Sequence, residues 1–184
     1  FILGTNQFPN FTEKSEGKRA MTCQCSCGSH NDSTFKAIES TRLAADFEDL
    51  RINVENSNKV PVAFMLTIGN LAMRQARAQF SCNFLAAAGY KVIDNLGFET
   101  VEAGAAAARE AGADIVVLCS SDDEYATLAP EAWKTLKDAK ELFIVAGAPA
   151  CSEDLKALGI NNFINVRSNV LETLKTFNAQ LLNK

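Results

Sequence analysis

Histidine is nearly absent from this sequence, and that scarcity limits its chemistry. His30 is the one histidine among 184 residues, and it precedes every segment that we expect to form a sheet. A histidine base, metal ligand or axial ligand inside the fold is therefore excluded unless a partner supplies it.

Long apolar runs are also missing. The sequence has no apolar stretch of about 18 residues or more, the length that a membrane helix needs, and no charged segment followed by an apolar one at its start. We therefore expect neither a membrane span nor a signal peptide, and we expect a cytoplasmic protein. The first residue is Phe1 rather than Met, so we also expect a fragment or a processed product.

Clustered positive charge is a third absence. The 18 Lys and Arg residues are scattered among 22 Asp and Glu residues, for a net charge of -4. No basic stripe with interleaved aromatic residues occurs, which argues against nucleic acid as a partner. Hydrophobic residues make up 47% of the chain, as expected of one globular domain with some extra chain.

Apolar segments of strand length alternate with helical patterns from about residue 59 onward. Most of these segments are β-branched or aromatic-rich without polar alternation, as in strands covered on both faces. We expect strands at 60–66, 90–95, 114–120, 141–148 and 162–167, and helices at 71–88, 98–111, 123–138, 152–158 and 169–183. This pattern predicts an α/β fold: a flavodoxin-like, doubly wound, five-stranded parallel sheet in three α/β/α layers.

Local signals support these helix boundaries. Gly89, Gly112 and Gly159 each follow a helical pattern, where a left-handed cap is favoured. Asn169 with Glu172 three residues later forms a plausible capping box. In the first of the five helices, an apolar residue recurs every four positions and predicts the stripe that faces the sheet: Ala76, Phe80, Phe84 and Ala88.

The first 58 residues differ from the rest. They are rich in Ser, Gly, Asn, Thr and charge, and we interpret them as a linker or arm, with a helix at about 34–53 that packs on the sheet domain or on a partner. We therefore divide the chain into 1–58 and the sheet domain 59–184.

The arm contains four potential zinc ligands: Cys23, Cys25, Cys27 and His30. Their number suits a zinc site, but the C-x-C-x-C spacing does not, because structural sites usually space cysteines two or more residues apart and draw on two segments. We favour a thiol-rich linker without metal and leave metal binding open. Cys82, Cys119 and Cys151 fall in or beside expected core elements and are interpreted as small apolar residues.

A ligand of this fold would lie where the strands end. Dinucleotide binding needs several glycines at the first turn, and only Gly69 is present. The sequence matches the residue patterns of a phosphoryl receiver site and of a flavin phosphate loop no better than that of a dinucleotide site. Asp122, Asp123 and Glu124 resemble a metal-binding trio, but we interpret them as first-turn acidic residues that face water and favour the helix dipole.

Three stretches carry a family resemblance: "IGNLAMRQARAQFSCNFLAAAGYKV", "EAGAAAAREAGADIVVLCSSDDEYATLAP" and "GAPACSEDLKALGINNFINVRSNVLETL". With them, the chain resembles the C-terminal region of methylmalonyl-CoA mutase small subunits, whose second domain is cobalamin-binding-like. "FILGTNQFPNF" resembles the exit of the barrel domain in that family, and "RLAADFEDLR" its helical lead into the second domain.

The resemblance also shows departures from the family's cobalamin motifs. The D-x-H-x-x-G turn that supplies an axial histidine corresponds to residues 67–72, which contain neither Asp nor His. The S-x-L element corresponds to Ser120, Ser121 and Asp122, and the G-G pair to Ala146 and Gly147. We therefore expect no catalytic residue and no bound cofactor here, only vestigial pocket positions: Gly69, Asn70, Leu71, Ser120, Ser121 and Gly147.

The resemblance implies a role in a heterodimeric isomerase. Its large subunit would bind adenosylcobalamin and interconvert methylmalonyl-CoA and succinyl-CoA, and this chain would be a non-catalytic, structural partner. Two alternatives stay open: a divergent cobalamin carrier without the axial histidine, and an unrelated small-molecule-binding module of the same fold.

Overall fold

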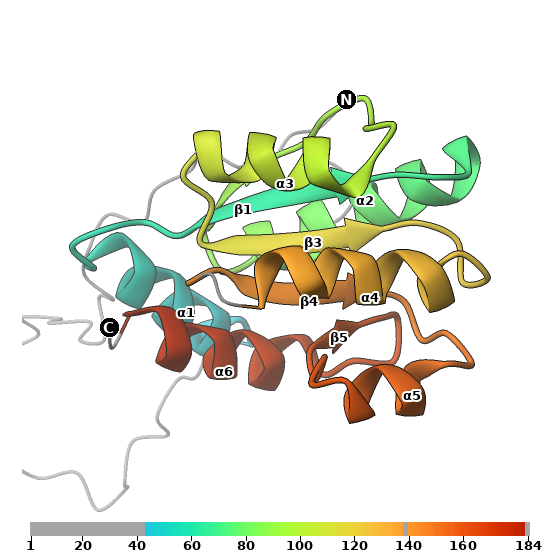
Figure 1. Cartoon of the computed structure of the whole chain (residues 1–184). Helices are drawn as coiled ribbons and strands as arrows, with labels where there is room; N and C mark the ends of the chain where they lie inside the picture. The colour runs from blue at the N-terminus through green and yellow to red at the C-terminus, as the bar shows by residue number, and fades with distance from the viewer. Residues whose placement is uncertain (1–42, 138–139, 183–184) are drawn as a thin grey trace, which may run out of the picture.

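The protein is described from a computed structural model that covers residues 43–137 and 140–182 (Figure 1). Its centre is a parallel sheet of five strands in the order β2-β1-β3-β4-β5. The strands are β1 (Val62–Thr67), β2 (Lys91–Ile93), β3 (Ile115–Cys119), β4 (Leu142–Ala146) and β5 (Phe163–Ile164). The predicted doubly wound fold is therefore confirmed, and its first strand lies beside the third, where the winding reverses.

Helices cover both faces of the sheet. They are α1 (Ala45–Glu55), α2 (Leu71–Ala86), α3 (Val101–Glu110), α4 (Tyr125–Leu136), α5 (Ser152–Ala157) and α6 (Val170–Leu182). One face carries α3, α4 and α5, with α3 and α4 in front of the sheet in Figure 1, and the other carries α1, α2 and α6. Within the described ranges, no helix has the length and apolar character that a bilayer span requires.

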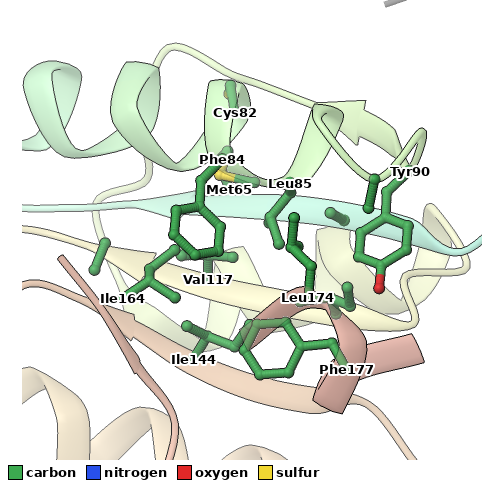
Figure 2. Close-up of a cluster of buried hydrophobic side chains, with 14 of the residues drawn as sticks. Met65, Cys82, Phe84, Leu85, Tyr90, Val117, Ile144, Ile164, Leu174 and Phe177 are labelled. Atoms are coloured by element: carbon green, nitrogen blue, oxygen red, sulfur yellow. The ribbon is translucent and has the colours of Figure 1, made fainter. Parts of the chain in front are cut away.

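The core on the α2 and α6 face is built from large side chains of the central strands (Figure 2). Met65, Val117 and Ile144 project from three neighbouring strands toward Phe84 of α2 and Phe177 of α6. All five side chains are buried. The strands are apolar on both faces because a second cluster fills the space under α3, α4 and α5.

The lead-in helix is present as α1, and it packs against α6. Leu50 and Val54 of α1 are buried in the core shared with α2 and α6. The part of the predicted helix before residue 43 and the arm with Cys23, Cys25, Cys27 and His30 lie outside the described residues, so the metal question there stays open.

Element boundaries differ from the prediction mainly at strand and helix ends. β5 was predicted over 162–167, but it ends at Ile164 because the chain then turns: the Asn165 N–H donates to Ser168 Oγ at 3.0 Å. Helix α3 begins at Val101 rather than at residue 98, because the Thr100 hydroxyl caps it by accepting from the Ala103 N–H at 3.2 Å. The expected cap at Asn169 is confirmed by its bond from the Glu172 N–H, also at 3.2 Å.

The predicted apolar stripe of α2 is partly wrong. Phe84 and Ala88 are buried, but Ala76 is exposed and Phe80 only half-buried. A strict four-residue repeat overshoots the 3.6-residue turn and drifts around the helix, so its first and last members cannot share one face. Nearer the start of the helix the buried positions are instead Ala78, Ser81 and Cys82.

Candidate functional site

Glu124 is the residue around which the carboxyl edge of the sheet is organised. Its carboxylate accepts hydrogen bonds from Ser120 Oγ at 2.6 Å, from Ser121 Oγ at 2.7 Å and from the Ser121 N–H at 3.2 Å. It also accepts from the Asn70 N–H at 3.2 Å. One carboxylate thus joins the end of β3 to the turn between β1 and α2.

These bonds stabilise the ionised form of Glu124. The Ser120 and Ser121 hydroxyls contribute most, the Asn70 and Ser121 amides add to them, and together they lower the pKa of Glu124 to about 2. Glu124 is consequently a permanent negative charge at neutral pH, held at the positive end of α2.

The turn beneath this carboxylate requires glycine. Gly69 has φ +80, and a Cβ built there would lie 2.3 Å from Glu124 Oε2. The next residue, Asn70, caps α2 by accepting from the Met73 N–H at 3.2 Å. The N–H of Asn70 donates a hydrogen bond to the Glu124 carboxylate. The side chain of the following residue, Leu71, projects outward and is 56% exposed.

A second ion pair lies beside the first network. Arg77 of α2 donates to Asp122 Oδ1 at 3.0 Å, and this pair spans from α2 to the turn after β3. A Cβ built on Gly147 would lie 3.0 Å from the same Asp122 oxygen. The pair therefore occupies the space between the ends of β3 and β4.

Tyr125 joins those two strand ends from inside. Its hydroxyl accepts from the Ser120 N–H at 3.0 Å and donates to the Ala146 carbonyl at 2.5 Å, and the residue is fully buried. Burial raises the pKa of Tyr125, so the hydroxyl stays neutral. The Ala146 methyl group lies on the other side, in the core with Ile144.

Arg74 and Asn95 hold the β2 side of the edge in the same manner. Arg74 donates to the carbonyls of Gly69 and Leu96, each at 3.1 Å. The Asn95 amide donates to the Met65 carbonyl, and its oxygen accepts from the Thr67 hydroxyl at 2.6 Å. Each strand end from β2 to β4 is therefore tied to its neighbour by a side chain of this chain.

An open groove remains next to this network, on the α3 and α4 side. Its volume is about 570 Å³, and it is lined by Ile68, Gly69, Arg74, Phe98, Glu99, Glu124, Thr127, Leu128 and Glu131. Glu124 lies between this groove and the serine hydroxyls. The groove carries three carboxylates and one guanidinium, so its charge is net negative.

The prediction that the acidic trio faces water in the first turn of a helix is therefore wrong in two respects: the environment of Glu124 and the residue at which the helix begins. Helix α4 begins at Tyr125, so the three residues precede its first turn, and Glu124 is half-buried in a hydrogen-bond network. A sequence signal existed: Ser121 and Glu124 match the S-x-x-E pattern of a capping box. Arg74 and Arg77 were missed, because nothing local in the sequence relates them to loops distant along the chain.

The pocket positions Gly69, Asn70, Ser120 and Ser121 all meet at Glu124. Gly147 lies one strand away beside Asp122, and Leu71 faces outward.

Within the part of the chain that the structure describes, no group of three or more His, Cys, Asp or Glu residues could hold a metal ion. Burial raises the pKa of the Cys82 thiol to about 12, as expected of a core cysteine rather than a nucleophile.

These residues do not fit a corrinoid bound through a protein imidazole. The only histidine of the chain, His30, lies in the arm, and the turn after β1 offers Thr67, Gly69 and Asn70 instead. The Asn70 N–H and the Ser120 and Ser121 hydroxyls at this edge are already bonded to Glu124.

Comparisons with known proteins agree with the resemblance in the sequence. The chain is 59% identical over 180 residues to the methylmalonyl-CoA mutase small subunit of Porphyromonas gingivalis, an alignment that covers 96% of this chain and 28% of that protein. It is 28% identical over 141 residues to the methylmalonyl-CoA mutase small subunit of Streptomyces virginiae, covering 77% of this chain and 22% of that protein. The chain thus spans less than a third of the length of these curated relatives.

A search with protein-family models found no match. Among solved structures, a novel cobalamin-binding protein from Desulfitobacterium hafniense DCB-2 is similar with a TM-score of 0.50 and 16% identity, covering 76% of this chain and 71% of that one. At that identity the likeness concerns the fold alone. By its sequence, this chain belongs with the methylmalonyl-CoA mutase small subunits, as a homologue of part of their length.

Proposed function

We propose that this chain is a structural domain in the small subunit of a heterodimeric, cytoplasmic methylmalonyl-CoA mutase. The assembled enzyme interconverts methylmalonyl-CoA and succinyl-CoA on its large subunit, which holds adenosylcobalamin. The identity of 59% to a small subunit over nearly the whole chain is the observation that carries this proposal.

The described site supports a role without a cofactor of its own. A corrinoid coordinated by the protein needs an imidazole near the first strand end, and the residues present there are Thr67, Gly69 and Asn70. The Ser120 hydroxyl and the Ser120 N–H at the crevice are bonded internally, to Glu124 and to Tyr125. A sheet domain can keep its packed core while its site residues change, because the core depends on burial rather than on the ligand.

The remaining role is then to form an interface. Subunits that assemble permanently do so through large and largely apolar contacts. In this proposal, the sheet domain at 59–184 and the arm at 1–58 contribute shape and stability to the heterodimer, and the vestigial pocket contributes no chemistry.

The decisive experiment titrates this chain with adenosylcobalamin and follows the absorption spectrum of the corrin. We expect no spectral change, and in parallel we expect the chain to coelute with the large subunit in size-exclusion chromatography after coexpression. A saturable spectral shift would contradict the cofactor-free role and would favour the divergent carrier. Failure to coelute, together with a shift in melting temperature caused by a nucleotide, would favour an unrelated binding module.

A further inference from the structure

A second groove lies between the first and the last helix, on the face of the sheet that carries α2. Helices α1 and α6 pack side by side there (Figure 1). The groove has a volume of about 280 Å³ and is lined by Leu50, Asn53, Lys175, Asn178, Ala179 and Leu182. It shares no lining residue with the groove beside Glu124, so the two are separate sites.

Asn178 is the buried polar residue of this groove. Its exposed fraction is 8%, although asparagine is mostly an exposed residue in proteins. Asn178 Oδ1 accepts a hydrogen bond of 2.6 Å from the hydroxyl of Tyr90, which Figure 2 shows in the core next to α6. Burial raises the pKa of Tyr90, so this hydroxyl keeps the proton that it donates. The bond therefore fixes the orientation of the Asn178 carboxamide.

That orientation leaves the nitrogen of the same carboxamide unused. The oxygen and the nitrogen are attached to one planar carbon and diverge from it, so an oxygen turned toward Tyr90 turns the nitrogen away from Tyr90. Within the described residues, Asn178 Nδ2 has no hydrogen-bond partner. A carboxamide nitrogen carries two donors, and donors with little access to water are costly to leave unpaired. An acceptor atom that entered the groove would meet them.

The neighbouring side chains determine which acceptor fits. Lys175 lies three residues before Asn178 on α6, and side chains at this spacing share one side of a helix. Its ammonium group is 3.2 Å from Glu172 Oε1, but both partners of this ion pair are exposed, so the pair is weak. Among the described residues that line the groove there is no carboxylate. The groove therefore favours a negatively charged acceptor, in contrast to the acidic groove beside Glu124.

The remaining wall is largely apolar. Three aliphatic side chains contribute to it: Leu50, Ala179 and Leu182. Leu50 is itself part of the core under α1 and α6, and Leu182 packs against that core. An anion held by Asn178 and Lys175 would thus carry its hydrocarbon tail along an apolar surface, where burial of the tail adds to the affinity.

We propose that the groove between α1 and α6 binds a short aliphatic carboxylate. The carboxylate accepts hydrogen bonds from Asn178 Nδ2 and Lys175 Nζ, and its tail contacts Leu50 and Leu182. The volume of about 280 Å³ is close to the lower limit of small-molecule sites, roughly 300 Å³, so the tail is short. This inference goes beyond the proposed structural role, since it assigns a ligand class to a site away from the strand ends.

The test titrates the isotope-labelled chain with hexanoate at neutral pH and constant ionic strength. NMR resonances of Ala179 and Leu182 report on the groove, and we expect both to shift and to reach saturation. Two control ligands separate the head group from the tail. Hexylammonium has the same tail with a positive head group and should cause no saturable shift, and acetate has the same head group with almost no tail and should bind more weakly.

Lys175→Gln tests the head-group contact without touching the core. It should weaken hexanoate binding by about tenfold, as expected for the loss of one charge-assisted hydrogen bond. Lys156→Gln is the matched control, because Lys156 is also an exposed lysine paired with a glutamate three residues away, at 2.7 Å from Glu153 Oε1 on α5. The control should bind hexanoate as the native chain does.

Asn178→Asp tests the amide while keeping the size of the side chain. One carboxylate oxygen can still accept from Tyr90, and the other puts a negative charge where the ligand needs a donor, so hexanoate binding should be lost. Lys175→Gln and the control ligands decide the matter even if Asn178→Asp does not fold.

Three results would overturn the proposal: no saturable shift with hexanoate, an equal response to hexylammonium, or equally tight binding by Lys175→Gln and Lys156→Gln. Native-like binding by a folded Asn178→Asp would overturn it as well. The cobalamin titration follows a different ligand by the spectrum of the corrin, so this proposal and the structural role can fail separately.

Discussion

The Tyr125 hydroxyl offers a test of how the carboxyl edge is held together. Tyr125→Phe removes one oxygen and keeps the ring, so the packing of the fully buried side chain is preserved. The oxygen bridges two strands, accepting from the Ser120 N–H at 3.0 Å and donating to the Ala146 carbonyl at 2.5 Å. Its loss therefore leaves one backbone donor and one backbone acceptor without this partner.

The expected loss of stability follows from the free-energy penalty of leaving buried polar groups without hydrogen-bond partners. Each such group costs about 1–3 kcal/mol, so we expect Tyr125→Phe to lower the free energy of unfolding by about 2–3 kcal/mol. For a domain of this size that corresponds to a fall in melting temperature of roughly 5–10 °C. Urea denaturation measures the change, and an unaltered m value would show that the unfolded state is unaffected.

Tyr90→Phe is the matched control for this measurement. The Tyr90 hydroxyl is also buried, but it makes one side-chain bond, donating to Asn178 Oδ1 at 2.6 Å on the α6 side of the sheet. We expect its removal to cost about 1–2 kcal/mol. If Tyr125→Phe costs no more than Tyr90→Phe, the hydroxyl does not hold the two strands together, and the reasoning about the edge is refuted.

Three further predictions concern the same edge. The folded-state pKa of Glu124 is about 2, below its ordinary value of about 4.5. The stability that Glu124 contributes is therefore complete above about pH 4.5 and is lost as the pH falls toward 2. Urea midpoints measured across this range should depend less steeply on pH in Glu124→Gln than in the native protein. Gly69→Ala should lower the free energy of unfolding by about 1–2 kcal/mol, because the backbone of Gly69 is left-handed. The close contact between the new Cβ and the Glu124 carboxylate should add to this loss. A double-mutant cycle with Glu124→Ala should therefore show coupling between the two positions. The double substitution Thr67→Asp with Gly69→His, which places Asp and His where the D-x-H-x-x-G turn aligns with residues 67–72, should not create cobalamin binding, since Glu124 still takes the donors at this turn; a corrin spectral shift in the double variant would contradict this.

The outline of the fold was predictable because it depends on local patterns. β3 is apolar at every position from Ile115 to Cys119, and this uninterrupted burial is what a central parallel strand requires. The caps at Thr100 and Asn169 set helix starts by short-range hydrogen bonds, and the latter was visible as a motif. The apolar face of α2 was harder to predict, because a repeat of small residues such as Ala76 carries little information about which side packs.

The candidate site was only partly predictable. Ser120, Ser121 and Asn70 were identified as positions at the strand ends, since parallel strands bring those ends to one edge. The residue that joins them is not evident from the sequence, which predicts Glu124 as one of three exposed acids at a helix start. Its bond to the Asn70 N–H connects residues 54 apart in the chain, and no local pattern encodes such a contact.

The sequence by itself determined the order of strands and helices, the lack of a histidine within the sheet domain and the kinship with mutase small subunits, since these depend on residue identity and short-range periodicity. Only the tertiary structure decided that the edge is closed from within. Closure requires Glu124, Arg77 and Arg74 to reach turns that are remote in sequence, and the distances among them are set by the packing of the sheet and its helices.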